Sequence, residues 1–313
     1  MIRFDGVSKA FGATRALDGF SLAAGRGLVY GLIGPNGAGK TTAMSILATL
    51  LLPDAGTATV DGLNVVDRAA EVRGRIGYMP DFFGVYDGLR AGEYLEFFAA
   101  AHQIPVQRRP GLVKTLLELV NLPDKAGVYV DSLSRGMKQR LALARCLVHD
   151  PDVLILDEPA SGLDPRARAE MKEIIRQLKR LDKTVLISSH ILPELAEICD
   201  RVAIMEAGKL VVSGPVAEIT AVSQGARRLC IEVLDRATEL AGFLSTRPGV
   251  SEAHADGTAA GFFFSGDRKE QAALLQAVIE GGWSVVECGE VRRNLEEVFM
   301  AVTGEGGENI DGN

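Results

Sequence analysis

A glycine-rich loop constrains this chain more than any other stretch. It reads Gly34-Pro35-Asn36-Gly37-Ala38-Gly39-Lys40-Thr41, between an apolar run at residues 28–33 and a helical pattern at residues 42–52. This is the pattern GxxxxGK(S/T) in the setting of strand, turn and helix, which a chance glycine turn does not explain. The glycines let consecutive backbone N–H groups curl around phosphate oxygens at the positive end of a helix. The loop therefore predicts a nucleoside triphosphate site, in which Lys40 reaches the β- and γ-phosphates and Thr41 ligates Mg²⁺.

The composition is that of a globular protein with one or two domains. The 313 residues are 47% hydrophobic and 24% charged, enough for a substantial core. No apolar run approaches the roughly 18–20 residues that cross a bilayer, and the first residues do not resemble a signal peptide, so we expect a cytoplasmic protein. The net charge of −7 gives no general attraction to nucleic acid. Reduced thiols are expected for the widely spaced cysteines, Cys146, Cys199, Cys230 and Cys288.

The residues before the loop predict antiparallel strands. Apolar segments at residues 2–7 and 17–22 flank a turn that contains Phe11. Two interpretations of Phe11 remain open: a core residue, or an aromatic ring that stacks on the nucleotide base. Farther on, residues 57–62 predict a strand with a tight turn, and residues 75–79 predict a strand that stops at Pro80-Asp81.

A helical pattern over residues 87–131 predicts a helical subdomain inserted into the sheet domain. It is followed by Leu133-Ser134-Arg135-Gly136-Met137 and an apolar helix. Ser134 has two interpretations. It is either an ordinary N-cap or part of a second phosphate-binding helix end.

Two carboxylates follow a buried strand. Residues 153–156 are Val-Leu-Ile-Leu, typical of a parallel strand covered on both faces, and they end in Asp157-Glu158. Carboxylates are poor core residues. Beside a phosphate loop, they indicate one acid for the Mg²⁺ shell and one that orients or deprotonates the attacking water.

Asp164 and His190 mark two further element ends. Asp164 is the predicted N-cap of a helix, whose expected buried stripe is Met171, Ile174, Ile175, Leu178 and Leu181. His190 follows a buried strand at residues 184–189. A lone histidine is usually structural, but its place at the ligand-binding edge of such a sheet favours a phosphate contact.

Beyond residue 215 the predicted order of strands and helices changes. Strands are predicted at 228–234, 250–254, 261–264 and 283–288, and helices at 237–245, 269–280 and 295–302. This α+β order over residues 216–303 is compatible with a ferredoxin-like module. It contains no nucleophile, metal cluster or glycine loop, so an accessory or regulatory role is expected. The acidic, glycine-rich residues 304–313 are expected to be disordered.

Taken in order, these motifs resemble the ATP-binding subunit of an ABC transporter over residues 1–215. The most distinctive element is the Leu-Ser-x-Gly stretch at residues 133–136, shortly before the strand that ends in Asp-Glu. The chain looks most like bacterial drug- and antibiotic-exporter ATPases with a C-terminal extension. The resemblance implies an α/β fold of the P-loop NTPase class. A mixed core sheet, an antiparallel β subdomain and a helical subdomain would precede the small α+β domain.

The resemblance implies a role for each residue of the ATP site. Phe11 would stack on adenine, and the loop from Gly34 through Thr42 would wrap the phosphates. Thr41 would ligate Mg²⁺, with Asp157 supporting its water shell. ATP and Mg²⁺ are thus the expected cofactors.

Catalysis and dimerisation are implied in the same way. Glu158 would be the general base or water-orienting residue, and His190 would contact the γ-phosphate. In the family, two subunits close head to tail on two ATP molecules. Ser134 and Gly136 would therefore act on the partner's ATP, and Asp164 would lie at the shared interface.

The partners implied are a multi-span membrane permease and a second ATP-binding subunit, identical or paralogous. The aromatic stretch at residues 82–86 is either buried or, as the resemblance implies, part of a groove for a short helix of the permease, and the interface is favoured. The protein would be peripheral on the inner face of the cell membrane and would power export. Family members that act on DNA carry inserted coiled coils, and those that act on ribosomes usually carry two such domains. Neither feature is present, and no nucleic acid partner is expected.

Two positions depart from the family pattern. Asp81 replaces the usual glutamine, and Arg135-Gly136-Met137 replaces Gly-Gly-Gln. Asp81 can ligate Mg²⁺ through oxygen but cannot donate an amide hydrogen bond. These departures keep open a third interpretation, a module that senses ATP with little turnover.

Overall fold

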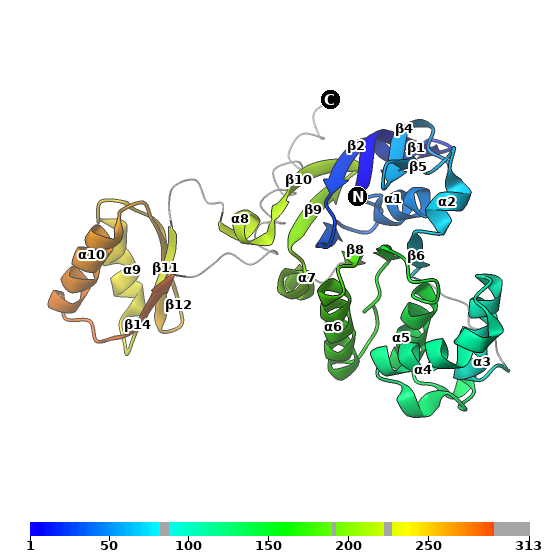
Figure 1. The fold of residues 1–313 in the computed structure, drawn as a ribbon. Helices are drawn as coiled ribbons and strands as arrows, with labels where there is room; N and C mark the ends of the chain where they lie inside the picture. The colour runs from blue at the N-terminus through cyan, green and yellow to red at the C-terminus, as the bar shows by residue number, and fades with distance from the viewer. Residues whose placement is uncertain (82–87, 190–191, 222–226, 291–313) are drawn as a thin grey trace. The chain divides into compact units, whose positions relative to one another are not determined.

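The computed structural model describes residues 1–81, 88–189, 192–221 and 227–290 (Figure 1). Contacts divide the chain into two units, one built on residues 1–216 and the other on residues 217–301. Within the described ranges, no helix is both long and apolar enough to cross a membrane. The described cysteines are all free thiols.

A six-stranded sheet forms the centre of the first unit, in the order β10-β9-β3-β8-β7-β6. Its neighbours are parallel except for the edge hairpin of β9 and β10. Every residue of β3, β7 and β8 is buried, as expected for strands covered on both faces. The bounds are β3 (Val29–Ile33), β6 (Ile76–Met79), β7 (Val153–Leu156), β8 (Thr184–Ser189), β9 (Arg201–Glu206) and β10 (Lys209–Pro215).

A second, antiparallel sheet has the order β2-β1-β4-β5. Its core face packs with α1 (Lys40–Leu47), whose residues Met44, Ile46 and Leu47 are fully buried. This helix ends five residues earlier than predicted, and Thr49 beyond it has a φ of 64°. The strands are β1 (Ile2–Phe11), β2 (Thr14–Ala24), β4 (Ala55–Val60) and β5 (Leu63–Asn64). The predicted antiparallel strands before the loop are thereby confirmed.

The helical subdomain is formed by α3, α4 and α5, which contact one another (green in Figure 1). Tyr94 and Leu95 of α3 are buried, whereas Phe97 is exposed. On α6 the predicted stripe is buried except for Leu181, which is 59% exposed just beyond the helix end. The further helices of this unit are α2 (Ala69–Arg73), α3 (Ala91–Ala101), α4 (Arg109–Leu119), α5 (Arg135–Cys146), α6 (Pro165–Arg180) and α7 (Leu192–Ile198), and the boundary with the second unit falls at the start of α8 (Val216–Ala221).

The second unit has a four-stranded sheet in the order β12-β13-β11-β14, with antiparallel neighbours throughout. This order, with a helix after the first and third strands, confirms the predicted ferredoxin-like arrangement. Leu240 and Leu244 of α9 and Val278 of α10 pack on its core face. The elements are β11 (Arg227–Val233), α9 (Ala237–Ser245), β12 (Val250–Asp256), β13 (Ala259–Phe264), α10 (Arg268–Glu280) and β14 (Val285–Glu290). The predicted closing helix and tail lie outside the described residues.

Candidate nucleotide-binding site

The glycine-rich loop joins the end of β3 to the start of α1. Gly37 and Gly39 have φ values of +85° and +101°, in the left-handed region where side chains are strained. A Cβ on Gly39 would lie 2.4 Å from the Ala16 carbonyl oxygen, whereas one on Gly37 would meet nothing within 4 Å. Gly39 is therefore required for space as well as for conformation.

This difference predicts unequal costs for two matched substitutions. Gly37→Ala should destabilise the protein by about 1–2 kcal/mol, the cost of a left-handed non-glycine residue. Gly39→Ala should cost at least about 3 kcal/mol, because the methyl group also collides with backbone. Scanning calorimetry of both variants checks this, and equal melting temperatures would contradict it.

The side chain of Lys40 is held in place by backbone carbonyl groups of the loop. Its Nζ donates hydrogen bonds to the carbonyl oxygens of Gly34, at 2.6 Å, and Pro35, at 3.1 Å. The side chain is only 7% exposed. Burial lowers the pKa of Lys40, and the carboxylates of Glu158 and Asp157 oppose that shift. The loop thus carries a preoriented ammonium group next to two acids.

A cavity of 310 Å³ opens beside the loop. Phe11 on its wall is 52% exposed, so the core interpretation of this residue is wrong. The Nζ of Lys9 lies 5.8 Å from the centroid of the Phe11 ring. The cavity is lined by Phe11, Thr14, Ala16, Asn36, Gly37, Ala38, Gly39, Lys40, Thr41, Thr42, Asp81 and Glu158. Residues far apart in sequence therefore meet at one site.

Asp157 and Glu158 leave β7 in different environments. Asp157 is 1% exposed, and its Oδ1 accepts a hydrogen bond of 2.5 Å from Ser188 Oγ. The backbone N–H of Glu158 donates to the same Ser188 oxygen at 2.9 Å. Ser188 was not singled out from the sequence. The signal for it is the parallel register of β7 and β8, which pairs Leu156 with Ile187 and so brings the next residues together.

The oxygen atoms at this site fit a magnesium ion. Asp157 Oδ2 is buried and accepts no hydrogen bond from protein, an unsatisfied position that a cation shell would occupy. Thr41 and Asp81 both line the cavity. Across the described ranges there is no group of three or more His, Cys, Asp and Glu residues that could hold a metal alone. Mg²⁺ in such sites takes one or two carboxylates together with substrate phosphates.

Asp81 follows the end of β6, and Tyr78 of that strand lies near it. The Tyr78 side chain hydrogen-bonds Ser45 of α1. Burial raises the pKa of Tyr78, with the nearby Asp157 and Asp81 acting in the same direction, so it stays a neutral phenol. This contact ties the end of β6 to the helix of the phosphate loop.

Ser134 and Asp164 cap two neighbouring helices. Ser134 Oγ accepts from the Met137 N–H at 3.3 Å, and Asp164 Oδ1 accepts from the Ala167 N–H at 2.9 Å. Both predicted N-caps are confirmed. The helix starts are in contact, because a Cβ on Gly136 would lie 2.8 Å from the Ala167 Cβ. Neither cap nor Gly136 is among the described residues that line the loop's own cavity.

Of the residues near these caps that depart from the family pattern, Arg135 has a defined neighbour. The Arg135 guanidinium lies against Gly162, where an added Cβ would be 2.5 Å from Arg135 Cζ.

His190, and the predicted aromatic groove at residues 82–86, lie outside the described residues.

Comparisons with known proteins agree with this geometry. The family described as "ABC transporter" matches residues 17–161. A daunorubicin resistance ATP-binding protein of Streptomyces coeruleorubidus is 36% identical over 97% of this chain and 96% of its own length. A Nod factor export ATP-binding protein I of Burkholderia lata is 44% identical over 68% of this chain and 70% of its own length.

Solved structures give the same result. A structure of an ATP-binding subunit of an ABC transporter is 27% identical, with a TM-score of 0.64, over 70% of this chain and 91% of that chain. A dimeric cassette in a post-hydrolysis state with ADP and Pi, 23% identical, shares the fold with a TM-score of 0.63 over 69% of this chain and 99% of that chain. The similarity along nearly the full chain, and the cavity lined by the phosphate loop and Glu158, show that this protein belongs to the ATP-binding subunits of ABC transporters, in their drug- and exporter-type branch.

Proposed function

We propose that this chain hydrolyses ATP, with Mg²⁺, to drive export through a separate membrane permease. The observation that carries the proposal is the cavity in which Phe11, Lys40, Thr41, Asp81 and Glu158 meet. One site thus combines a ring that can stack on the base, a lysine for the phosphates, oxygen atoms for the metal and an acid that can orient water. Phosphoryl transfer to water needs this combination, since positioning and charge stabilisation do most of the catalytic work.

Each side chain then has a part in the reaction. The exposed ring of Phe11 stacks on adenine, and Lys40 exchanges its carbonyl partners for the β- and γ-phosphates. Thr41 and Asp81 would hold Mg²⁺, with Asp157 supporting its water shell, and the ion would supply positive charge against the phosphoryl oxygens. Glu158 orients or deprotonates the attacking water.

The remaining motif residues act across a dimer in this proposal. Ser134 and Gly136, which do not line their own chain's cavity, contact ATP held by a second subunit. Asp164 lies at that interface, and His190 contacts the γ-phosphate. The second subunit is another copy of this chain or a paralogue.

Residues 1–215 form the ATPase domain of the proposed transporter subunit, and residues 216–303 form an accessory domain. The names of the relatives, daunorubicin resistance and Nod factor export, support export as the direction. The protein would sit on the inner face of the cell membrane through its permease. An action on nucleic acid or ribosomes is not favoured by these relatives.

The proposal is tested by purification under conditions that trap ATP. The Glu158→Gln variant is tagged in its own cells, and the membranes are solubilised gently. Proteins that copurify with the variant in the presence of ATP are then identified. A multi-span membrane protein, absent from a parallel Lys40→Met preparation, is the expected result. Recovery of ribosomes or DNA without any membrane protein would overturn the transporter role while leaving the ATPase site intact.

The metal role of Asp81 predicts a change in Mg²⁺ dependence. Asp81→Ala should raise the Mg²⁺ concentration for half-maximal hydrolysis about tenfold, because one oxygen donor is lost. Asp81→Gln, which keeps an oxygen donor without the charge, should lie between this variant and the unmodified protein. Steady-state phosphate release at varied Mg²⁺ measures both. An unchanged half-saturation in Asp81→Ala would exclude the role.

A further inference from the structure

The backbone of Glu158 has a strained conformation. Its φ is +49°, in the left-handed region, where a residue with a side chain persists only if the surrounding contacts hold it. Two such contacts lie on Glu158 itself. Its N–H donates to Ser188 Oγ at 2.9 Å, and its carbonyl oxygen accepts from the Ser161 N–H at 3.0 Å. The direction in which the Glu158 side chain leaves the backbone therefore depends on the turn that ends at Ser161.

Gln139 of α5 bonds this turn through the other backbone group of Ser161. The Gln139 side chain is only 2% exposed, and its Nε2 donates a hydrogen bond of 3.2 Å to the Ser161 carbonyl oxygen. Ser161 thus has its N–H bonded to Glu158 and its carbonyl oxygen bonded to Gln139. A change at Gln139 can reach Glu158 through this one residue.

The first residues of α5 contact the same loop between β7 and α6. The Arg135 guanidinium fills the space beside Gly162, and a Cβ on Gly136 would lie 3.6 Å from Leu163 Cδ2. Arg135 and Gln139 are four residues apart, so both lie on one face of the helix. This face of α5 therefore holds the loop at consecutive points.

Gln139 makes its contact at a cost in stability. The second amide atom, Oε1, is buried and accepts no hydrogen bond within the part of the chain that the structure describes. A buried acceptor without a donor costs at least as much stability as one hydrogen bond contributes. An apolar side chain of the same length would avoid this cost. The balance indicates that the amide serves the loop rather than the stability of the fold.

We infer that Gln139 is a positioning residue for Glu158. Through the backbone of Ser161, it fixes the direction of the carboxylate that orients or deprotonates the attacking water. The inference rests on the function proposed above, and it adds a residue that does not line the ATP cavity. A small misplacement caused by a residue away from the reacting atoms can slow a reaction about 100-fold.

Single-turnover hydrolysis of radiolabelled ATP by the full chain tests the inference. Gln139→Met keeps the length of the side chain and removes the donor. The variant should fold, because it also removes the unsatisfied oxygen, and its melting temperature checks this. The hydrolysis rate constant should fall about 10–100-fold, whereas the dissociation constant for ATP should change less than about twofold. Arg109→Met is the matched control and should hydrolyse normally, since Arg109 Nε also donates to a backbone carbonyl, that of Ile104 at 2.8 Å, but at the start of α4.

The same change in a Glu158→Gln background separates positioning from a general structural role. There Gln139→Met should lower the remaining rate less than about twofold, because the group that it positions is gone. A structural role would lower the rate as much as it does in the unmodified protein. Arg135→Ala is a second variant, at an exposed position where folding is not at risk. It should slow hydrolysis about threefold or more, again only while Glu158 is present.

Three results would overturn the inference. Gln139→Met could hydrolyse ATP as fast as Arg109→Met, it could keep its full effect without Glu158, or it could lower only the affinity for ATP. If Gln139→Met does not fold, Arg135→Ala decides by the same criteria. Absence of hydrolysis by the unmodified protein would instead contradict the proposed function itself.

Discussion

Replacing Glu158 by glutamine is expected to slow ATP hydrolysis about 10²–10⁴-fold while ATP binding is retained. The backbone N–H of Glu158 is anchored by Ser188, so the amide side chain should occupy the position of the carboxylate. Glutamine has nearly the same size and can still accept a hydrogen bond, but it is a far weaker base. Only the step that needs a base or a strong water-orienting acceptor should therefore fail.

The measurements are phosphate release, for hydrolysis, and binding of a fluorescent ATP analogue. Size-exclusion chromatography with ATP should also show a trapped dimer, since hydrolysis no longer reopens it. Glu218→Gln on α8 is the control, because this exposed acid is not among the residues that line the cavity. Hydrolysis by Glu158→Gln at the rate of the control would remove Glu158 from the proposed mechanism. Equally low turnover in the unmodified protein would instead favour the ATP-sensing interpretation.

Replacing Lys40 by methionine is expected to weaken ATP binding about 100-fold or more. The ammonium group is proposed to bond two phosphates, and charge-assisted hydrogen bonds contribute about 1.5–3 kcal/mol each. The fold should be little affected, because methionine has a similar length and burial already disfavours the charged lysine, as its lowered pKa shows. The expected variant is thus a folded protein with a defective ATP site.

Equilibrium binding of ATP and the melting temperature without nucleotide check the two parts of this expectation. Lys114→Met is the control, since Lys114 on α4 is exposed and pairs only weakly with Glu118, at 3.9 Å. Unchanged ATP affinity in Lys40→Met would contradict the assignment of the loop. A large fall in melting temperature would mean that the contacts of Lys40 with Gly34 and Pro35 are mainly structural.

Patterns that are local in sequence were predicted well. The phosphate loop, the buried strands β7 and β8, and the N-caps Ser134 and Asp164 all depend on residues within a few positions of one another. Their sterics and hydrogen bonds are set by neighbours in the chain. Helix ends were less predictable, since the early end of α1 and the exposure of Leu181 depend on what packs nearby.

Contacts between distant residues required the structure. The sequence left Phe11 open between core and ligand contact, because its pattern is the same in both cases; its exposure on the cavity wall decides against the core. The Ser188 bridge between Asp157 and Glu158 depends on the register of two strands separated by α6. Register is a property of the assembled sheet and is not encoded in either strand alone.

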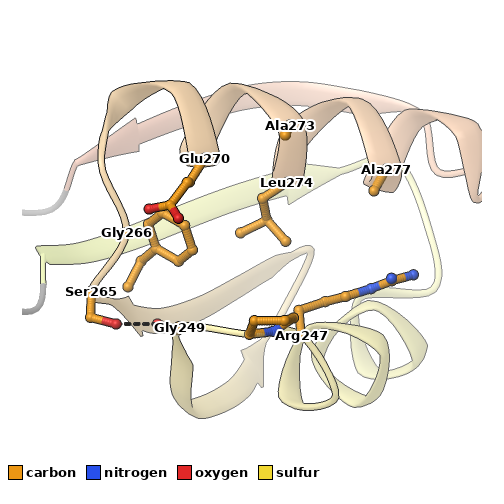
Figure 2. A pocket seen from close by; sticks show the side chains of 10 residues that line it. Arg247, Gly249, Ser265, Gly266, Glu270, Ala273, Leu274 and Ala277 are labelled. Carbon is orange, nitrogen blue, oxygen red and sulfur yellow. Dashed lines mark hydrogen bonds between the residues drawn. The ribbon is translucent and has the colours of Figure 1, made fainter.

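The amino-acid sequence was enough to predict that this chain binds a nucleoside triphosphate, because glycine positions dictate the loop's conformation and a single lysine supplies its charge. It also predicted the order of elements in both units. The folded structure was needed to show which side chains share a cavity. That holds for Asp81 and Glu158 beside Lys40, and for Arg247 and Glu270, which line a cavity of the C-terminal unit (Figure 2). The reason is physical: a cavity exists only once several elements have packed, and its charges come from residues that the chain keeps far apart until it folds.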